Sequence, residues 1–143
     1  MRIATTAMAT LALGTSLLVP SAHAAAPNTT EVALASCKGA SCNGLTPEAG
    51  GCADNATTLD ARSLSGAMVE LRYNGACRAA WVKIHGPVGT NGTVANTANP
   101  QNTYFTQIDR GSDAHSQMVN DMDLKAAACM TVPGAGTVCT DWK

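Results

Sequence analysis

The chain has 143 residues, of which 45% are hydrophobic, 3% aromatic and 13% charged, and its formal net charge at pH 7 is −1. This length fits one domain. The balanced charge argues against a nucleic-acid partner, which would call for clustered Lys and Arg, and against electrostatic docking on an anionic membrane.

Residues 1–24 are predicted to be a cleavable signal peptide. Arg2 supplies a charged start, an apolar Ala- and Leu-rich stretch runs from Ile3 to Val19, and Ala22-His23-Ala24 is a small-residue cleavage site. Cleavage after Ala26 is an alternative that satisfies the same rule. The apolar stretch is shorter than the ~20 residues of a membrane span, and no later segment is apolar enough to cross a bilayer. We therefore expect a secreted protein with no membrane span after signal removal.

The rest of the chain divides into two parts. Residues 25–36 are small and polar without periodicity, and they are predicted to be a flexible mature N-terminus. Residues 37–143 are predicted to be a disulfide-rich β domain. Its first stretch, from Cys37 to Asp60, is rich in Gly and has little to bury, so disulfides and turns rather than regular structure are expected to set its shape.

All the cysteines lie beyond the cleavage site, and their even number in an exported chain predicts three disulfides. The residues are Cys37, Cys42, Cys52, Cys77, Cys129 and Cys139. A zinc site is the rival interpretation, but the sequence lacks a second tight Cys pair. Spacing alone leaves fifteen pairings open. We favour Cys129 with Cys139, because a Pro- and Gly-containing turn separates two β-prone runs, and then Cys52 with Cys77 and Cys37 with Cys42.

The clearest periodic segment runs from Met68 to Tyr73, where apolar residues alternate with Glu70 and Arg72, as in a half-buried strand. Asn74-Gly75 is a turn signal, and a second run from Cys77 to Ile84 completes a predicted β-hairpin. The second run also fits a helical face, but it is short for a helix, so a strand is preferred.

Further short strands are expected over 93–96, 104–109, 127–132 and 137–142. Segment 118–125 fits either a short helix or a loop. Short strands at this spacing predict a mainly β fold, a small disulfide-stabilised antiparallel barrel or sandwich.

The sequence offers no catalytic, cofactor or metal site that we would assign. His85 and His115 have no evident nucleophile partner, and scattered carboxylates are more typical of loop caps than of a glycosidase pair. The oxygen-rich segments 109–113 and 120–123 could attract calcium, but neither has EF-hand spacing. No Gly-rich phosphate loop indicates a nucleotide. We expect a protein that is not an enzyme.

The predicted hairpin presents the most promising binding surface. If its apolar face packs inward, charged side chains point outward, and they form the candidate recognition face: Glu70, Arg72, Arg78 and Lys83. A solvated surface without a partner is the simpler interpretation of such a face.

The chain also resembles a family of small exported bacterial domains of unknown function, sometimes called YjfA-like. The matching residues include Cys37, Cys42-x-Gly44, Val69-Glu70-Leu71-Arg72-Tyr73 and Cys77-Arg78-Ala79-Ala80-Trp81. The resemblance implies an extracytoplasmic β domain and no known activity. The family usually has an acidic residue before the first loop proline, where this chain has Thr46.

These observations together predict a secreted, non-enzymatic binding domain whose partner is an extracellular macromolecule or a cell-wall component. The alternative is a secreted inhibitor of an extracellular hydrolase, in which the loop 132–138 would be the inhibitory segment. A loop that a disulfide preorganises loses less entropy when it binds.

Overall fold

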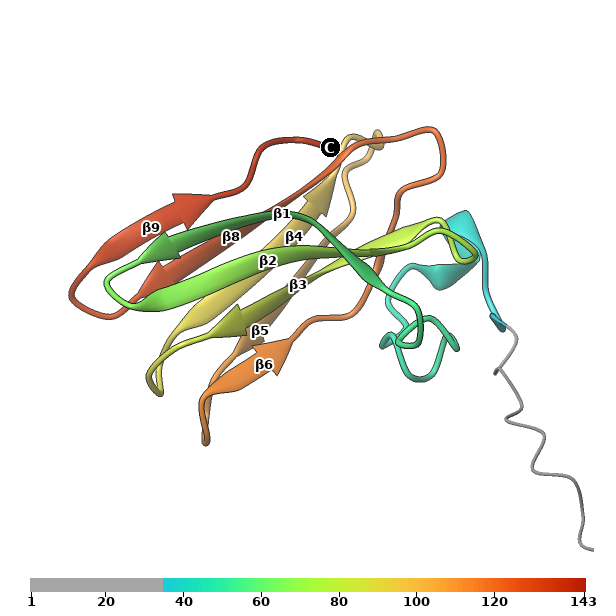
Figure 1. The fold of residues 1–143 in the computed structure, drawn as a ribbon. Helices are drawn as coiled ribbons and strands as arrows, with labels where there is room; N and C mark the ends of the chain where they lie inside the picture. Colours follow the sequence, from blue (N-terminus) through green and yellow to red (C-terminus); the bar gives the residue numbers. More distant parts are fainter. Residues whose placement is uncertain (1–34) are drawn as a thin grey trace, which may run out of the picture. The chain divides into compact units, whose positions relative to one another are not determined.

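The computed structural model describes residues 35–143 (Figure 1). The predicted signal peptide, residues 1–24, and all but the last two residues of the predicted flexible segment 25–36 lie outside the described residues. Within the described part, no helix is long and apolar enough to cross a membrane.

The described part contains one short 3-10 helix and a series of strands. In chain order they are η1 (Gly39–Cys42), β1 (Thr57–Leu64), β2 (Ala67–Asn74), β3 (Ala79–His85), β4 (Asn91–Asn96), β5 (Thr103–Gln107), β6 (Asp113–His115), β7 (Val119–Asn120), β8 (Ala126–Val132) and β9 (Gly136–Cys139).

The strands form two antiparallel sheets. Sheet A has the order β1-β2-β3-β6, with β7 also paired to β3, and sheet B has the order β5-β4-β8-β9. The two sheets face each other across a common core (Figure 1). The predicted mainly β, disulfide-stabilised antiparallel fold is therefore confirmed, and the arrangement is that of a sandwich.

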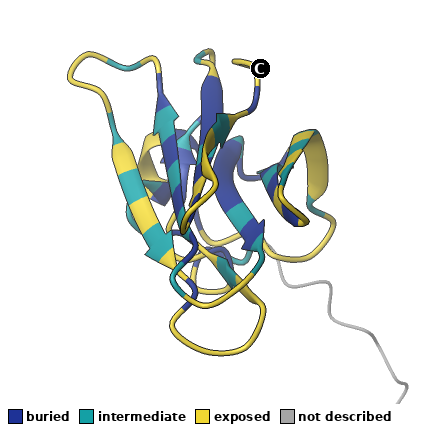
Figure 2. Cartoon of the chain, turned by 90° about the vertical axis from the view of Figure 1, so that its left-hand side faces the viewer, coloured by how far each residue is buried: buried dark blue, intermediate teal, exposed yellow. Residues whose placement is uncertain are grey.

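Every second side chain along the strands points inward and fills this core. Val69 and Leu71 of β2 are fully buried, and Val94 of β4 and Met130 of β8 are fully buried on the facing sheet. Figure 2 shows the same alternation of buried and exposed positions along the strands. The inward direction predicted for the apolar side chains of β2 is confirmed.

Gly92 of β4 packs directly against β3 of the facing sheet. A Cβ atom built there would lie 2.9 Å from Cγ2 of Ile84 and 3.3 Å from Cγ2 of Val82. Any larger residue would push β4 away from β3, because close-packed interiors leave no room for an extra methyl group.

The predicted hairpin exists as β2 and β3, and its second run is a strand rather than a helix. Two details of the prediction are wrong: the turn has four residues, from Gly75 to Arg78, and the strand starts at Ala79 rather than Cys77. The Asn74 side chain explains the longer turn, since its Oδ1 accepts hydrogen bonds from the backbone N–H groups of Ala76 and Cys77.

Strand β1 was missed, because the segment 37–60 was expected to lack regular structure throughout. It is an edge strand whose register to β2 shifts between Thr58 and Asp60. A β-bulge of this kind interrupts the period-two pattern by which a strand is recognised. The four later strands were placed within a few residues of their observed bounds.

Segment 118–125 does not form a helix. Val119 and Asn120 pair with Ala80 and Ala79 as the short strand β7. Met118 and Val119 are both fully buried. Successive side chains of a strand point to opposite faces, so two adjacent buried residues indicate a strand that is covered on both faces. They do not indicate a helix that buries one face.

Candidate functional site

The outer face of sheet A carries most of the charged side chains that the sheets present. Alternation on β2 and β3 turns Glu70, Arg72 and Lys83 outward, opposite the buried Leu71 and Val82. The register places Arg72 beside Trp81, Glu70 beside Lys83 and Lys83 beside His115 of β6. Pairing of strands distant in sequence thus collects these groups on one surface.

Three of the four residues of the candidate recognition face lie on this surface, and the fourth does not. Arg78 lies in the β2–β3 turn with a φ of 48°. Its Nη2 donates to Oδ1 of Asp123 at 2.8 Å. The four-residue turn moves Arg78 out of the strand, which is why the prediction from alternation failed for it.

Glu70 connects the charged groups of the surface. Its carboxylate accepts a hydrogen bond from the Thr58 hydroxyl at 2.7 Å, and its other oxygen lies 3.1 Å from Nε2 of His85. Although burial raises the pKa of Glu70, the hydrogen bonds of Thr58 and His85 and the charge of Arg72 together lower it below the ordinary value. Glu70 is therefore a carboxylate at neutral pH.

Arg72 is held by the same group of residues. Its Nη1 donates to the Thr58 hydroxyl at 2.6 Å and its Nη2 to the Ala56 carbonyl at 3.0 Å. The guanidinium is also 3.7 Å from the Glu70 carboxylate. Arg72 is thus fixed in place before any ligand arrives, and a preorganised group loses little entropy on binding.

A pocket of about 150 Å³ opens where the Cys-rich loop, residues 37–56, reaches over this surface. It is lined by Pro47, Glu48, Ala53, Arg72, Trp81, Lys83, Asp113 and His115. Glu48 comes from the loop, and its carboxylate lies 3.3 Å from Nε2 of His115. Lys83 has no ion-pair partner among residues 35–143. Its ammonium group is therefore available to a ligand.

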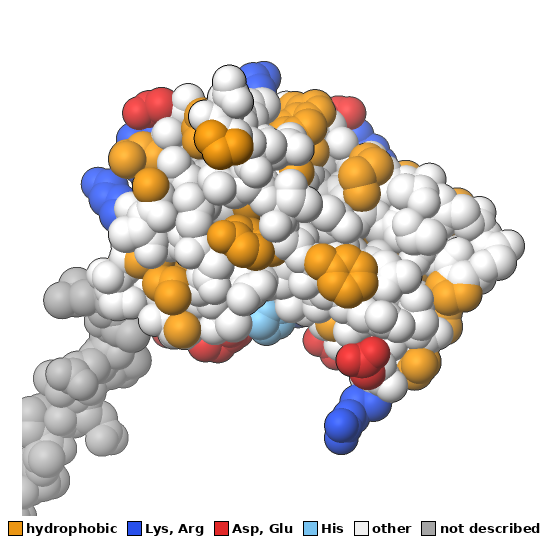
Figure 3. Space-filling view, turned by 180° about the vertical axis from the view of Figure 1, so that it is seen from behind, with side chains coloured by type: hydrophobic (Ala, Val, Ile, Leu, Met, Phe, Trp, Pro, Cys, Tyr) orange, Lys and Arg blue, Asp and Glu red, His pale blue; other side chains and the backbone are white. Residues whose placement is uncertain are grey.

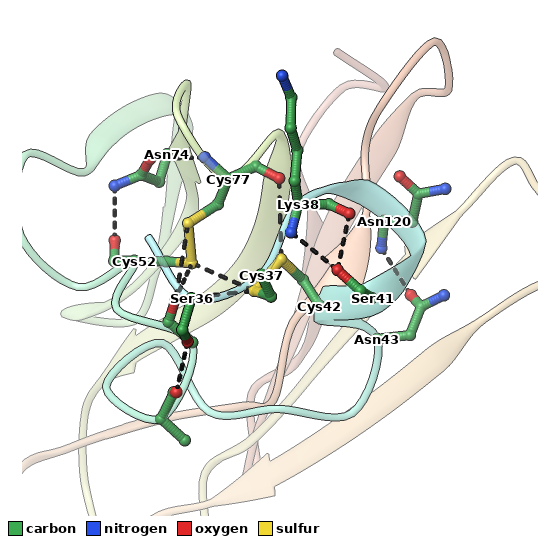
Figure 4. The surroundings of a disulfide bond; sticks show 12 residues. Ser36, Cys37, Lys38, Ser41, Cys42, Asn43, Cys52, Asn74, Cys77 and Asn120 are labelled. Atoms are coloured by element: carbon green, nitrogen blue, oxygen red, sulfur yellow. Dashed lines mark hydrogen bonds between the residues drawn. A yellow bond between two sulfur atoms is a disulfide. The ribbon is translucent and has the colours of Figure 1, made fainter. Parts of the chain in front are cut away.

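Two adjacent disulfides hold the loop, and one of them attaches it to the turn between β2 and β3 (Figure 4). The pairs are Cys37–Cys42 and Cys52–Cys77, and Sγ atoms of the two pairs, on Cys37 and Cys52, lie 3.6 Å apart. Trp81 is only 4% exposed and packs in this cluster, so the disulfides support the floor of the pocket. With Cys129–Cys139, the structure contains all three pairings that we favoured.

The four clustered cysteines also raise the question of a metal. Their Sγ atoms lie within 4.8 Å of one another, and they are the only group of three or more His, Cys, Asp or Glu side chains in the described part close enough to share an ion. The Gly50 carbonyl oxygen lies 3.2 Å from Sγ of Cys52 and 3.8 Å from Sγ of Cys37. A carbonyl dipole directed at sulfur disfavours the thiolate that a metal requires, so we assign this cluster to disulfides.

The two oxygen-rich segments do not gather ligands for calcium. In the segment 120–123, Asp123 pairs with Arg78, and Oδ1 of Asn120 accepts a hydrogen bond from the Met122 N–H group. In the segment 109–113, Asp113 is part of β6 and lines the pocket. These oxygens are directed to separate contacts rather than to one point.

Asp121 is a buried carboxyl group without a hydrogen-bond partner at Oδ1. Burial raises its pKa from 3.8 to about 6, against the opposing charge of Arg78. The folded state therefore binds more protons than the unfolded state between about pH 4 and 6, so the free energy of unfolding falls as the pH rises through this range.

Replacing Asp121 with Asn should remove this dependence. We expect Asp121→Asn to be more stable than wild type by about 1–3 kcal/mol at pH 7.5 and nearly equal to it at pH 4. Urea unfolding at the two pH values measures the difference. An equal effect at both pH values would show that ionisation of Asp121 is not the cause.

Sequence reasoning missed several lining residues. Glu48 is one of the scattered carboxylates to which the sequence assigns no role, and His115 is considered there only as a catalytic candidate. The alternation Trp81-Val82-Lys83-Ile84-His85 carries a usable signal, because it places an aromatic, a cation and an imidazole on one face of a strand. Nothing in the sequence indicated that Glu48 would meet His115.

A comparison with family models matches residues 40–129 to a family described as a protein of unknown function, DUF2690. The match supports the uncharacterised domain family that the resemblance implied, while the YjfA-like name stays a prediction. The comparisons with curated proteins and with solved structures found no match.

Proposed function

Since the chain belongs to the DUF2690 family of proteins of unknown function, we propose its role from the geometry: it is an extracellular, non-enzymatic binding domain that acts at the cell envelope, and the pocket on sheet A is its ligand site. The disulfides support an extracellular location, since such bonds persist in oxidising compartments. The proposal rests on the fixed Arg72 and on Lys83, which has no ion-pair partner in the described part of the chain, beside the Trp81 floor.

The charges of the pocket indicate the class of ligand. Basic groups come from β2 and β3, at Arg72 and Lys83, and acidic groups come from the loop and β6, at Glu48 and Asp113. A ligand that carries both an acidic and a basic group, such as a short peptide of an envelope polymer, complements both sides. Complementary charges of this kind fix orientation and partner choice more than raw affinity.

The pocket lining also supports a binding rather than a catalytic role. Among the described residues that line it there is no serine, threonine or thiol to act as a nucleophile. Nε2 of His115 faces the Glu48 carboxylate and Nδ1 lies 3.3 Å from the Ser116 carbonyl oxygen, so within residues 35–143 neither nitrogen contacts a serine, threonine or thiol nucleophile.

Replacing Lys83 tests the proposal. In co-sedimentation of the mature, oxidised protein with purified cell walls of its own host, we expect Lys83→Ala to reduce retention by about tenfold, because one charge-assisted contact is lost. Lys125→Ala, which removes a solvent-exposed lysine elsewhere, is the matched control and should bind as wild type does. Retention of Lys83→Ala at the wild-type level would rule out the pocket as the ligand site.

The inhibitor alternative rests on the β8–β9 hairpin. The Cys129–Cys139 disulfide closes it, and its exposed tip consists of Pro133, Gly134 and Ala135. A rigid, protruding tip suits insertion into an enzyme cleft. Unchanged rates across a panel of secreted hydrolases in the presence of the protein would dismiss this alternative.

A further inference from the structure

The outer face of sheet B differs in character from the outer face of sheet A. Cross-strand neighbours place its outward side chains in three rows across β5, β4, β8 and β9. The first row holds Gln107, Asn91, Thr131 and Thr137, the second Phe105, Thr93 and the Cys129–Cys139 disulfide, and the third Thr103, Ala95 and Ala127.

None of these described side chains is charged. In Figure 3, which views the molecule from the side opposite to Figure 1, charged side chains lie toward the margins, while backbone, side chains of uncharged polar types and separate hydrophobic side chains fill the middle. Charged residues make up 13% of the whole chain, and those that lie within the described strands all belong to sheet A. The outer face of sheet A is therefore charged, and the outer face of sheet B is uncharged.

The uncharged face is regular and held in place. Neighbouring strands lie about 4.8 Å apart and outward residues on one strand about 6.7 Å apart, so hydroxyl and amide groups recur at short, even intervals. The Cys129–Cys139 bond and the 2.7 Å contact between the hydroxyls of Thr131 and Thr137 fix β8 to β9. At the opposite edge of sheet B, Phe105 on the edge strand β5 is 59% exposed.

We propose that this face, independently of the pocket, binds an uncharged polysaccharide. Hydroxyl and amide side chains can exchange hydrogen bonds with the hydroxyls of a sugar chain, and the Phe105 ring can pack on the apolar face of one sugar ring. Because neither the face nor such a sugar chain is charged, no ion has to lose its hydration when they meet. A protein partner fits less well, because the face offers neither an apolar cluster for a buried interface core nor charges for a rim.

The test uses the mature, oxidised protein in co-sedimentation with microcrystalline cellulose and with chitin, both of which are uncharged. We expect retention on at least one of them, unchanged at high salt because no ion pair contributes. Phe105→Ala should reduce retention about tenfold, as expected for an aromatic anchor, and Thr93→Lys should reduce it as well. Thermal unfolding of both variants checks that they are folded.

Lys83→Ala is the control, because it changes the pocket and leaves sheet B intact. It should bind the uncharged polysaccharide as wild type does, so the two surfaces can fail separately. Lack of retention on both polysaccharides would overturn the proposal, as would retention that Phe105→Ala leaves unchanged. A dimer in light scattering that Thr93→Lys dissociates would instead assign the face to a second copy of the chain.

Discussion

The double variant Cys52→Ala/Cys77→Ala should lose about 3–4 kcal/mol of unfolding free energy. The bond joins residues separated by 25 positions in sequence, so its removal frees a long loop in the unfolded chain. It also removes the main covalent link between the Cys-rich loop and the sheet. Urea unfolding of the oxidised proteins measures the loss, and a variant as stable as wild type would contradict the structural role assigned to this bond.

The same variant should also weaken the pocket, because Glu48 lies on the loop that the bond attaches. The matched control is Cys129→Ala/Cys139→Ala, whose bond spans a separation of 10. Its expected cost is similar, about 3 kcal/mol, but its cell-wall retention should stay at the wild-type level below the unfolding temperature. Equal loss of retention in both variants would mean that lowered stability, rather than the loop, controls binding.

Local patterns were sufficient to predict the hairpin that carries most of the site. Alternation at Val69, Leu71 and Tyr73 placed Glu70 and Arg72 outside, because side chains alternate strictly along a strand. The same argument failed for Arg78, where a turn set by the Asn74 side chain interrupts the alternation. A side chain that forms hydrogen bonds with nearby backbone groups competes with the hydrogen bonds between strands. The alternation rule takes no account of this competition.

The pocket itself was beyond sequence reasoning, because it depends on contacts between distant segments. Strand β6 has only three residues and reaches Lys83 through a pairing that no local signal reports. The loop that carries Glu48 has no regular period at all. Its position is set by disulfides, whose partners spacing alone leaves open, by backbone hydrogen bonds to Cys77 and Met118, and by one buried asparagine.

That asparagine, Asn74, connects the end of β2 to the Cys-rich loop. Its Nδ2 donates to the carbonyl oxygens of Cys52 and Asp54, at 2.9 and 2.7 Å. Its Oδ1 accepts from the N–H groups of Ala76 and Cys77. The side chain is buried and uses both donors and its acceptor, so it holds the loop and the turn together.

Asn74→Asp keeps the size of the side chain but replaces the two donors with an acceptor. We expect a loss of about 3 kcal/mol or more at pH 7, because the buried Cys52 carbonyl and the partly buried Asp54 carbonyl lose their donor and face a carboxylate oxygen instead. At pH 4 the loss should be smaller, since protonation restores one donor. Asn55→Asp makes the same change at an exposed position of this loop and should alter stability by less than about 0.5 kcal/mol. Urea unfolding at both pH values decides the matter. A loss that does not depend on pH would show that the carboxylate does not face the two carbonyls, and the loop would then depend on its disulfides and backbone hydrogen bonds rather than on Asn74.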